Sequence, residues 1–266
     1  MHAFEYHRPS STKDALALAG QKDEARYLAG GQSLVQAMKL RLSAPSDLID
    51  LGSLKDLSFV RASASGVEIG AMTRHADVAG SKEVQKAIPA LAALANLIGD
   101  RQVRHMGTIG GSLANNDPAA DYPAAVLGLG ATITTSKRKI EADGFFKGLY
   151  ETALEPGELI TSVAFPAPKR AAYMKFKNPA SRFAIVGVFV ADFGGGKVRV
   201  GVTGAGPSAF RQADMEKALG AKFAPEAVAN IKVKPEGLNN DLHASPEYRA
   251  HLITVMAKRA VEAALK

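Results

Sequence analysis

The chain has 266 residues, 47% of them hydrophobic and 22% charged, which is typical of a folded protein with room for two domains and excludes a disordered chain. It contains no cysteine, so disulfides and cysteine-ligated iron–sulfur clusters within this chain are excluded. The formal net charge of +7 comes from Lys and Arg spread along the sequence without a dense basic block, which argues against a nucleic-acid partner.

The first predicted element is a helix over residues 33–42 that follows the glycine pair Gly30-Gly31. Period-two patterns predict strands over 67–72, 131–135 and 159–165, and helical spacing predicts a helix over 83–98 that restarts at Pro89. Prolines and charges at 165–170 mark the predicted domain boundary. Beyond it, we expect an antiparallel meander over 171–177, 183–191 and 197–203, covered by an amphipathic helix over 246–265.

Two glycine pairs are the most informative motifs, Gly30-Gly31 in residues 28–35 and Gly110-Gly111 in residues 108–112. Without a Cβ the backbone can approach a ligand closely, and successive free N–H groups can then point at anionic oxygens. Ser33 and Ser112 add hydroxyl donors. One such turn is common in proteins without a cofactor, but two together predict a diphosphate site, and the carboxylate of Asp121 suits a flavin nucleotide better than ATP.

These residues resemble the FAD-binding medium subunit of the molybdenum hydroxylases, the family of the carbon monoxide dehydrogenase flavoprotein and the xanthine dehydrogenase flavin domain. The resemblance continues through residues 176–187, 202–207 and 241–249 and so covers nearly the whole chain. It implies an α+β fold, with a two-lobed FAD-binding domain of the PCMH (vanillyl-alcohol oxidase) type at 1–168. Its lobes would be about 1–53 and 54–168, and a C-terminal domain of antiparallel sheet and helices would occupy 169–266.

The resemblance also implies the cofactor residues. Residues 28–35 and 108–112 would hold the diphosphate of FAD, Asp117 and Asp121 would follow the second loop, and Lys177 would lie by the isoalloxazine ring, where it could stabilise a reduced flavin. Apolar side chains would pack near the cofactor. The complete predicted set is Leu28, Ala29, Gly30, Gly31, Gln32, Ser33, Leu34, Val35, Ile98, Thr108, Ile109, Gly110, Gly111, Ser112, Asp117, Asp121, Leu159, Ile160 and Lys177.

Other sites are not indicated. The six histidines show no zinc-ligand spacing, no nucleophile motif is present, and we expect neither a metal site nor a catalytic side chain in this chain. Residues 202–209 have the outline of a dinucleotide fingerprint, but Pro207 interrupts the turn, so a structural loop is expected there.

The function expected from the resemblance is electron transfer by FAD, from [2Fe–2S] clusters on a partner chain to an external acceptor. The molybdenum cofactor would lie on a large partner subunit and the clusters on a small one, in a dimer of heterotrimers of the carbon monoxide dehydrogenase type. Three alternatives remain. The chain could be the medium subunit of an aldehyde, N-heterocycle or xanthine dehydrogenase, a self-contained FAD oxidoreductase, or a noncatalytic nucleotide-binding protein. Without a signal-peptide pattern or an apolar run of membrane-spanning length, a cytoplasmic location is expected.

Overall fold

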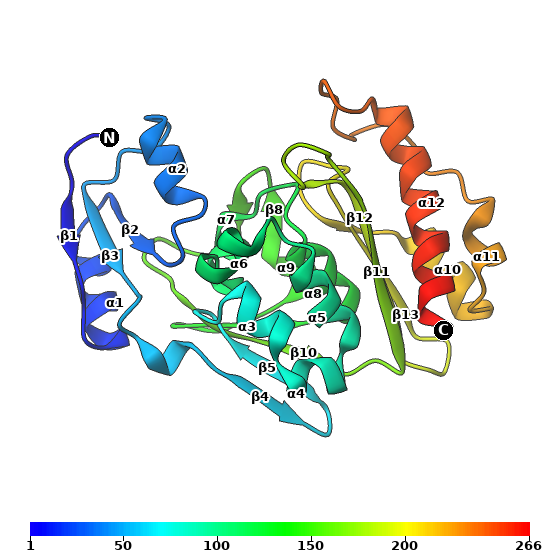
Figure 1. The fold of residues 1–266 in the computed structure, drawn as a ribbon, viewed down its shortest axis with the longest axis horizontal. Coiled ribbons are helices and arrows are strands. Elements are labelled where there is room, and N and C mark those ends of the chain that lie inside the picture. Colours follow the sequence, from blue (N-terminus) through cyan, green and yellow to red (C-terminus); the bar gives the residue numbers. More distant parts are fainter.

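The computed structural model describes residues 1–266 as three larger sheets arranged in a row and one two-stranded sheet, with helices between and around them (Figure 1). The N-terminal unit is a parallel sheet in the order β1-β3-β2 with two helices. Its elements are β1 (Glu5–His7), α1 (Thr12–Gly20), β2 (Ala25–Leu28), α2 (Leu34–Lys39) and β3 (Asp47–Asp50). A small core of Ala15, Ile49, Leu51, Leu54, Leu57 and Leu159 stabilises this unit.

The central unit is an antiparallel sheet in the order β4-β5-β10-β6-β7, covered by a layer of short helices. A hairpin of β8 and β9 lies beside it. The elements of the central unit are η1 (Lys55–Leu57), β4 (Val60–Ser63), β5 (Gly66–Gly70), α3 (His75–Gly80), α4 (Lys82–Ala87), α5 (Pro89–Asn96), α6 (Arg101–Met106), α7 (Ile109–Asn115), α8 (Tyr122–Leu129), β6 (Thr132–Thr135), β7 (Lys139–Glu141), α9 (Ala142–Phe145), β8 (Phe146–Gly148), β9 (Glu151–Thr152) and β10 (Ile160–Pro166).

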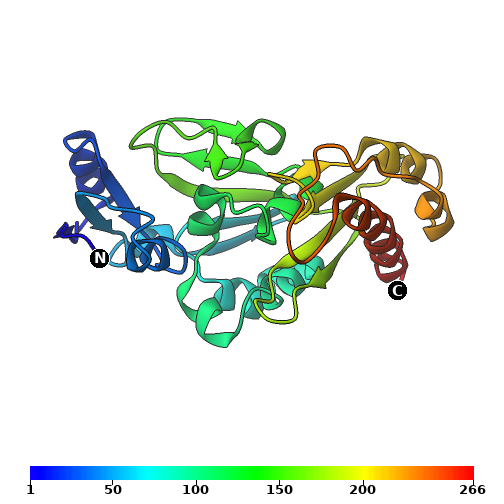
Figure 2. The ribbon, with the colours of Figure 1, turned by 90° about the horizontal axis from the view of Figure 1, so that it is seen from above.

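The C-terminal unit is an antiparallel meander in the order β11-β12-β13-β14 with three helices. Its elements are β11 (Arg170–Lys177), β12 (Ala184–Asp192), β13 (Val198–Thr203), β14 (Phe210–Arg211), α10 (Ala213–Ala221), α11 (Pro225–Ala229) and α12 (Pro246–Ala264). As expected, α12 packs on β11 and β12, while α5 and α8 of the central unit cover the opposite face of the same sheet (Figure 2). The predicted α+β fold is confirmed.

Local sequence explains the short central helices. Pro89 ends the hydrogen-bonding run of α4 and begins α5, so the helix predicted over 83–98 is two helices. Asp100 caps α6 through the N–H of Val103 at 2.9 Å, and Thr108 caps α7 through the N–H of Gly111 at 3.1 Å. None of the helices combines the length and the hydropathy that a passage through a bilayer would need.

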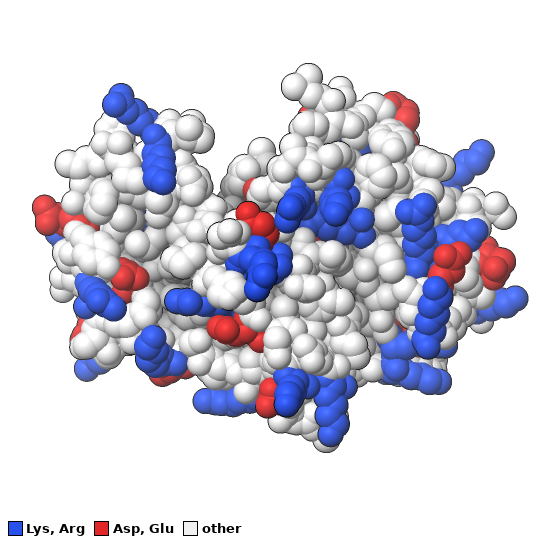
Figure 3. All heavy atoms as spheres, viewed as in Figure 1, with Lys and Arg blue, Asp and Glu red and all other residues white.

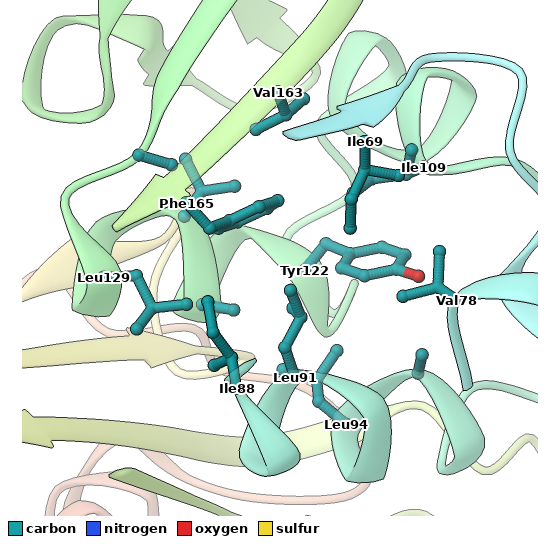
Figure 4. Close-up of a cluster of buried hydrophobic side chains, with 14 of the residues drawn as sticks. Ile69, Val78, Ile88, Leu91, Leu94, Ile109, Tyr122, Leu129, Val163 and Phe165 are labelled. Carbon is teal, nitrogen blue, oxygen red and sulfur yellow. The ribbon is translucent and has the colours of Figure 1, made fainter. Parts of the chain in front are cut away.

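The main hydrophobic core joins the central sheet to these helices (Figure 4). Tyr122, at the start of α8, points into it between Ile69, Ile109 and Val78. Every residue of α8 is buried, because the helix lies between the central sheet and the C-terminal sheet. The end of α7 and the start of α8 are therefore fixed in the middle of the molecule.

Candidate functional site

The two glycine segments meet in the structure. Gly30 lies so close to the turn before α7 that a Cβ on it would be 2.1 Å from the carbonyl oxygen of Met106 and 2.7 Å from the Cα of Gly107. A Cβ on Gly111 would lie 3.5 Å from that of Ala29. Segments about 80 residues apart in sequence thus form one continuous surface, because glycine removes the side chains that would separate them.

The first segment carries unpaired backbone donors. The consecutive N–H groups of residues 30–34, between β2 and α2, donate to no atom of the protein. The side chain of Ser33 also makes no capping bond, although it begins α2. A run of unpaired N–H groups at the start of a helix attracts an anion, since both the donors and the helix dipole favour negative charge. Gly31, with φ of +71°, makes this backbone path accessible.

The second segment differs from expectation. Its N–H groups are already paired: Ile109 donates to Thr73 O at 3.1 Å, Gly110 to Ala71 O at 2.8 Å, and Gly111 to the Thr108 hydroxyl at 3.1 Å. The prediction that both turns offer free N–H groups is therefore wrong for this one. The segment pairs instead with the end of β5, and it presents the Ser112 hydroxyl, which has no hydrogen-bond partner.

The packing of Gly110 explains why this position is glycine. A Cβ there would lie 2.6 Å from the Cβ of Ala71 and 2.8 Å from its carbonyl oxygen. Gly110 thus packs closely against the core of the protein. This contact fixes α7 against β5, so that the Gly110-Gly111 segment faces the Gly30-Gly31 loop.

The two predicted acidic residues lie along the segment that leads from α7 to α8. Asp117 accepts the N–H of Ala119 at 2.8 Å, and burial raises the pKa of its carboxyl. Asp121 is 4% exposed, and its two oxygens accept the Tyr173 hydroxyl at 2.5 Å and the Lys175 ammonium at 2.9 Å. Burial raises the pKa of Asp121, and the Lys175 charge opposes that rise.

The partners of Asp121 restrict what a ligand can reach. Both oxygens already accept hydrogen bonds from β11, and almost none of the side chain is accessible. We therefore interpret Asp121 as a residue that anchors the wall of the site through Lys175, whereas the sequence predicted a direct hydrogen-bond acceptor for the flavin.

A hollow of about 590 Å³ opens beside this pair, between the turn after α5 and the end of β11. The turn contributes Leu97 and Gly99, which flank the predicted Ile98, and β11 contributes Lys175 and the predicted Lys177. Lys175 also donates to the carbonyl of Leu97 at 3.1 Å, so it joins the two walls. The structure thus brings the predicted Lys177 to the segment around Ile98.

Leu159 and Ile160 lie elsewhere. Leu159 is 6% exposed and packs in the N-terminal core, and Ile160 is 3% exposed and packs in the central core. The surface that either side chain can offer a cofactor is therefore small, and their predicted contact with it stays a prediction.

Sequence reasoning missed Lys175 and Tyr173, whereas the charge of Arg104 could already be expected to attract an anionic cofactor. The two β11 residues share a face with Lys177, since side chains two apart in a strand point the same way, so the alternation around Lys177 was the available signal. Arg104 lies on α6 and donates to the carbonyl of Ile98 at 2.9 Å. No sequence pattern placed it beside β11, because that contact depends on how the central helices fold back.

The comparisons with known proteins agree with this geometry. A family described as "FAD binding domain in molybdopterin dehydrogenase" matches residues 2–168, and "CO dehydrogenase flavoprotein C-terminal domain" matches residues 171–264. The carbon monoxide dehydrogenase medium chain of Hydrogenophaga pseudoflava is 37% identical and covers 98% of this chain and 96% of its own length. The glyceraldehyde dehydrogenase medium chain of Sulfolobus acidocaldarius is 34% identical, with 97% and 96% covered.

Solved structures give the same result. Reconstituted CO dehydrogenase from Oligotropha carboxidovorans matches with a TM-score of 0.91 at 35% identity, covering 98% of this chain and 97% of that one. These findings confirm the predicted family and FAD as the cofactor of this chain, which the free N–H groups beside Gly31 fit. The chain therefore belongs to the family of FAD-binding medium subunits of the molybdenum-containing dehydrogenases.

Proposed function

We propose that this chain is the electron-transferring FAD subunit of a molybdenum hydroxylase complex of the carbon monoxide dehydrogenase type. The observation that carries the proposal is the run of unpaired N–H groups at residues 30–34, which faces the Gly110-Gly111 segment. The two relatives at 37% identity are both named carbon monoxide dehydrogenase medium chain. Two relatives at 34% identity are named as subunits of a glyceraldehyde dehydrogenase and a nicotine 6-hydroxylase, so an aldehyde or an N-heterocycle is the alternative substrate class.

The residues of this chain would divide the work of holding FAD. The N–H groups of residues 30–34 and the Ser112 hydroxyl would bind the diphosphate, because an anion satisfies donors that the protein leaves unpaired. The hollow between Leu97 and Lys177 would hold the isoalloxazine ring. The predicted contacts of residues 28–35, 108–112, Asp117, Leu159 and Ile160 belong to this proposal. FAD supplies the one- and two-electron chemistry when bound.

The proposed partners follow from what the chain lacks and from the family. Electrons would arrive from [2Fe–2S] clusters on a small subunit, since no cysteine is available here to hold a cluster. The molybdenum cofactor and the substrate would be bound by a large subunit, in a dimer of heterotrimers in the cytoplasm. We also propose a division of this chain at residues 168 and 169, with lobes of about 1–53 and 54–168 in the first part.

Co-expression with the neighbouring genes tests the proposal. The chain should co-purify with a cysteine-rich subunit and a large molybdenum subunit, and acid precipitation should release one FAD per copy of this chain. The complex should oxidise carbon monoxide with a dye as acceptor. The FAD-loaded chain alone should oxidise neither carbon monoxide nor aldehydes nor N-heterocycles. Turnover by the isolated chain would refute the subunit role in favour of a self-contained FAD oxidoreductase, and oxidation of an aldehyde but not carbon monoxide by the complex would correct the substrate class.

A further inference from the structure

The hollow beside β11 is strongly basic. Four of its eight lining residues are Lys or Arg, namely Arg104, Lys175, Lys177 and Arg182, and none is acidic. Figure 3 shows Lys and Arg side chains gathered on the face where the central and C-terminal units join. A hollow lined in this way favours negative charge inside it, because the cations around it create a positive potential that attracts anions.

Only one of these four cations has a counter-ion. Lys175 pairs with Asp121, and its side chain is 3% exposed. Arg104, Lys177 and Arg182 have no carboxylate within 4.0 Å. The nearest acid in sequence, Asp100, accepts the N–H of Val103 and is not part of the lining. Three positive charges around the hollow therefore remain uncompensated.

The three cations are also fixed to different degrees. Arg104 donates to the carbonyl of Ile98 at 2.9 Å and so is tied to the turn that forms one wall. The side chains of Lys177 and Arg182 make no hydrogen bond, although the backbone of Arg182 is held in a left-handed conformation with φ of +64°. One wall thus carries two cations without hydrogen-bond partners, and the other carries Arg104 and the exposed Leu97.

We propose that Arg104, Lys177 and Arg182 together hold negative charge on the isoalloxazine ring of bound FAD, an inference that rests on the function proposed above. An apolar surface at Leu97 suits a flat, uncharged ring, and three unpaired cations favour every form in which the ring becomes anionic. Lys177 was expected near the ring. The structure adds Arg104 and Arg182, and it assigns Lys175 to the neutral pair with Asp121.

Sulfite is a direct probe of this property. A lone pair on the sulfite sulfur forms a bond to N5 of the oxidised ring, and an electron pair of the ring moves to its N1–C2–O2 end, which then carries the negative charge. No oxidant or reductant takes part. A cation near the ring therefore strengthens sulfite binding, and its removal weakens binding.

The experiment titrates the FAD-loaded, full-length chain with sulfite and follows the loss of the visible flavin absorbance. Lys177→Met and Arg182→Met should each weaken sulfite binding roughly tenfold, as expected for one charge several ångströms away in a partly solvated site. Lys258→Met is the matched control, since it removes an exposed lysine of α12 on the other face of the C-terminal sheet. It should leave sulfite binding unchanged.

Two further measurements distinguish a failure of the proposed FAD binding from a failure of the proposed charge stabilisation. FAD fluorescence titration of each variant ensures that the cofactor is saturating, and a chain that takes up no FAD would refute the proposed function itself. A pH titration of the reduced flavin spectrum should give a higher N1 pKa in Lys177→Met and Arg182→Met than in the control. The inference is overturned if FAD binds but the wild-type chain forms no sulfite adduct, or if both variants match Lys258→Met.

Discussion

Replacing Gly30 with alanine should weaken FAD binding by roughly thirtyfold. The new Cβ would lie 2.1 Å from the carbonyl oxygen of Met106, where about 3 Å is the closest distance tolerated, so the two loops must separate by about 1 Å. Hydrogen bonds to a charged group contribute about 1.5–3 kcal/mol each, and displacement of one diphosphate contact then costs about 2 kcal/mol. That free energy corresponds to the predicted change in Kd.

The assay is a fluorescence titration of the apo chain with FAD, together with thermal unfolding. Gly20→Ala is the matched control, because a Cβ at the end of α1 meets no atom within 4 Å, and it should leave the Kd unchanged while stabilising the helix slightly. Gly30→Ala should also lower the free energy of unfolding by about 1–3 kcal/mol, since the clash is with backbone. A wild-type Kd for Gly30→Ala would refute the argument that the contact between the loops positions the FAD site.

Two more predictions concern buried ionisable groups. Lys175→Met should destabilise the fold by about 3 kcal/mol by leaving Asp121 without its counter-ion, and Asp121→Asn in the same chain should recover most of that loss in denaturant unfolding. Because burial already raises the pKa of Asp121, the Lys175→Met defect should shrink as the pH falls and that carboxyl takes up a proton; a defect that grows instead would contradict this. Burial lowers the pKa of His75 to about 4 from 6.5, so the folded state favours the neutral ring and loses stability as the pH falls below about 6.5. Between pH 7 and about pH 5 this loss should reach about 2 kcal/mol and should be absent in His75→Phe, whereas an equal loss in both proteins would show that His75 is not responsible.

The fold could be predicted well where the pattern is local. The restart at Pro89, the three strands of the meander and the helix over α12 all follow from proline chemistry and from the periodicity of apolar residues, which depend on neighbours in sequence. The parallel pairing of β1 and β2 with β3 was not predicted. It depends on crossover connections, and these short strands carry little pattern of their own.

The site could be predicted only in part, for a related reason. Glycine pairs indicate where the backbone must approach something closely, but they do not say what it approaches. Around Gly31 the backbone leaves donors free, whereas Gly110 approaches Ala71 and its N–H is paired with the protein. Whether a donor is free is decided by tertiary contacts, so the same motif leaves N–H groups unpaired in one place and packs against the core in the other.

The C-terminal unit holds the segment that follows the Gly110-Gly111 pair, even though the family boundary falls near residue 168. The segment between α7 and α8 is held from both units. Thr203 of the C-terminal sheet donates its hydroxyl to the carbonyls of Pro118 and Ala120, at 3.0 and 2.6 Å, and Gly204 N–H donates to Pro118 O at 2.8 Å. The Asn116 amide donates to the carbonyls of Gly148 and Glu151 in the central unit, at 2.8 and 2.7 Å. Asp121 completes this attachment through Lys175. Because α8 is buried between the two sheets, the C-terminal unit cannot move without also moving the residues that follow the Gly110-Gly111 segment. The geometry of the proposed FAD site therefore depends on both units at once, and the boundary in sequence does not divide the packing.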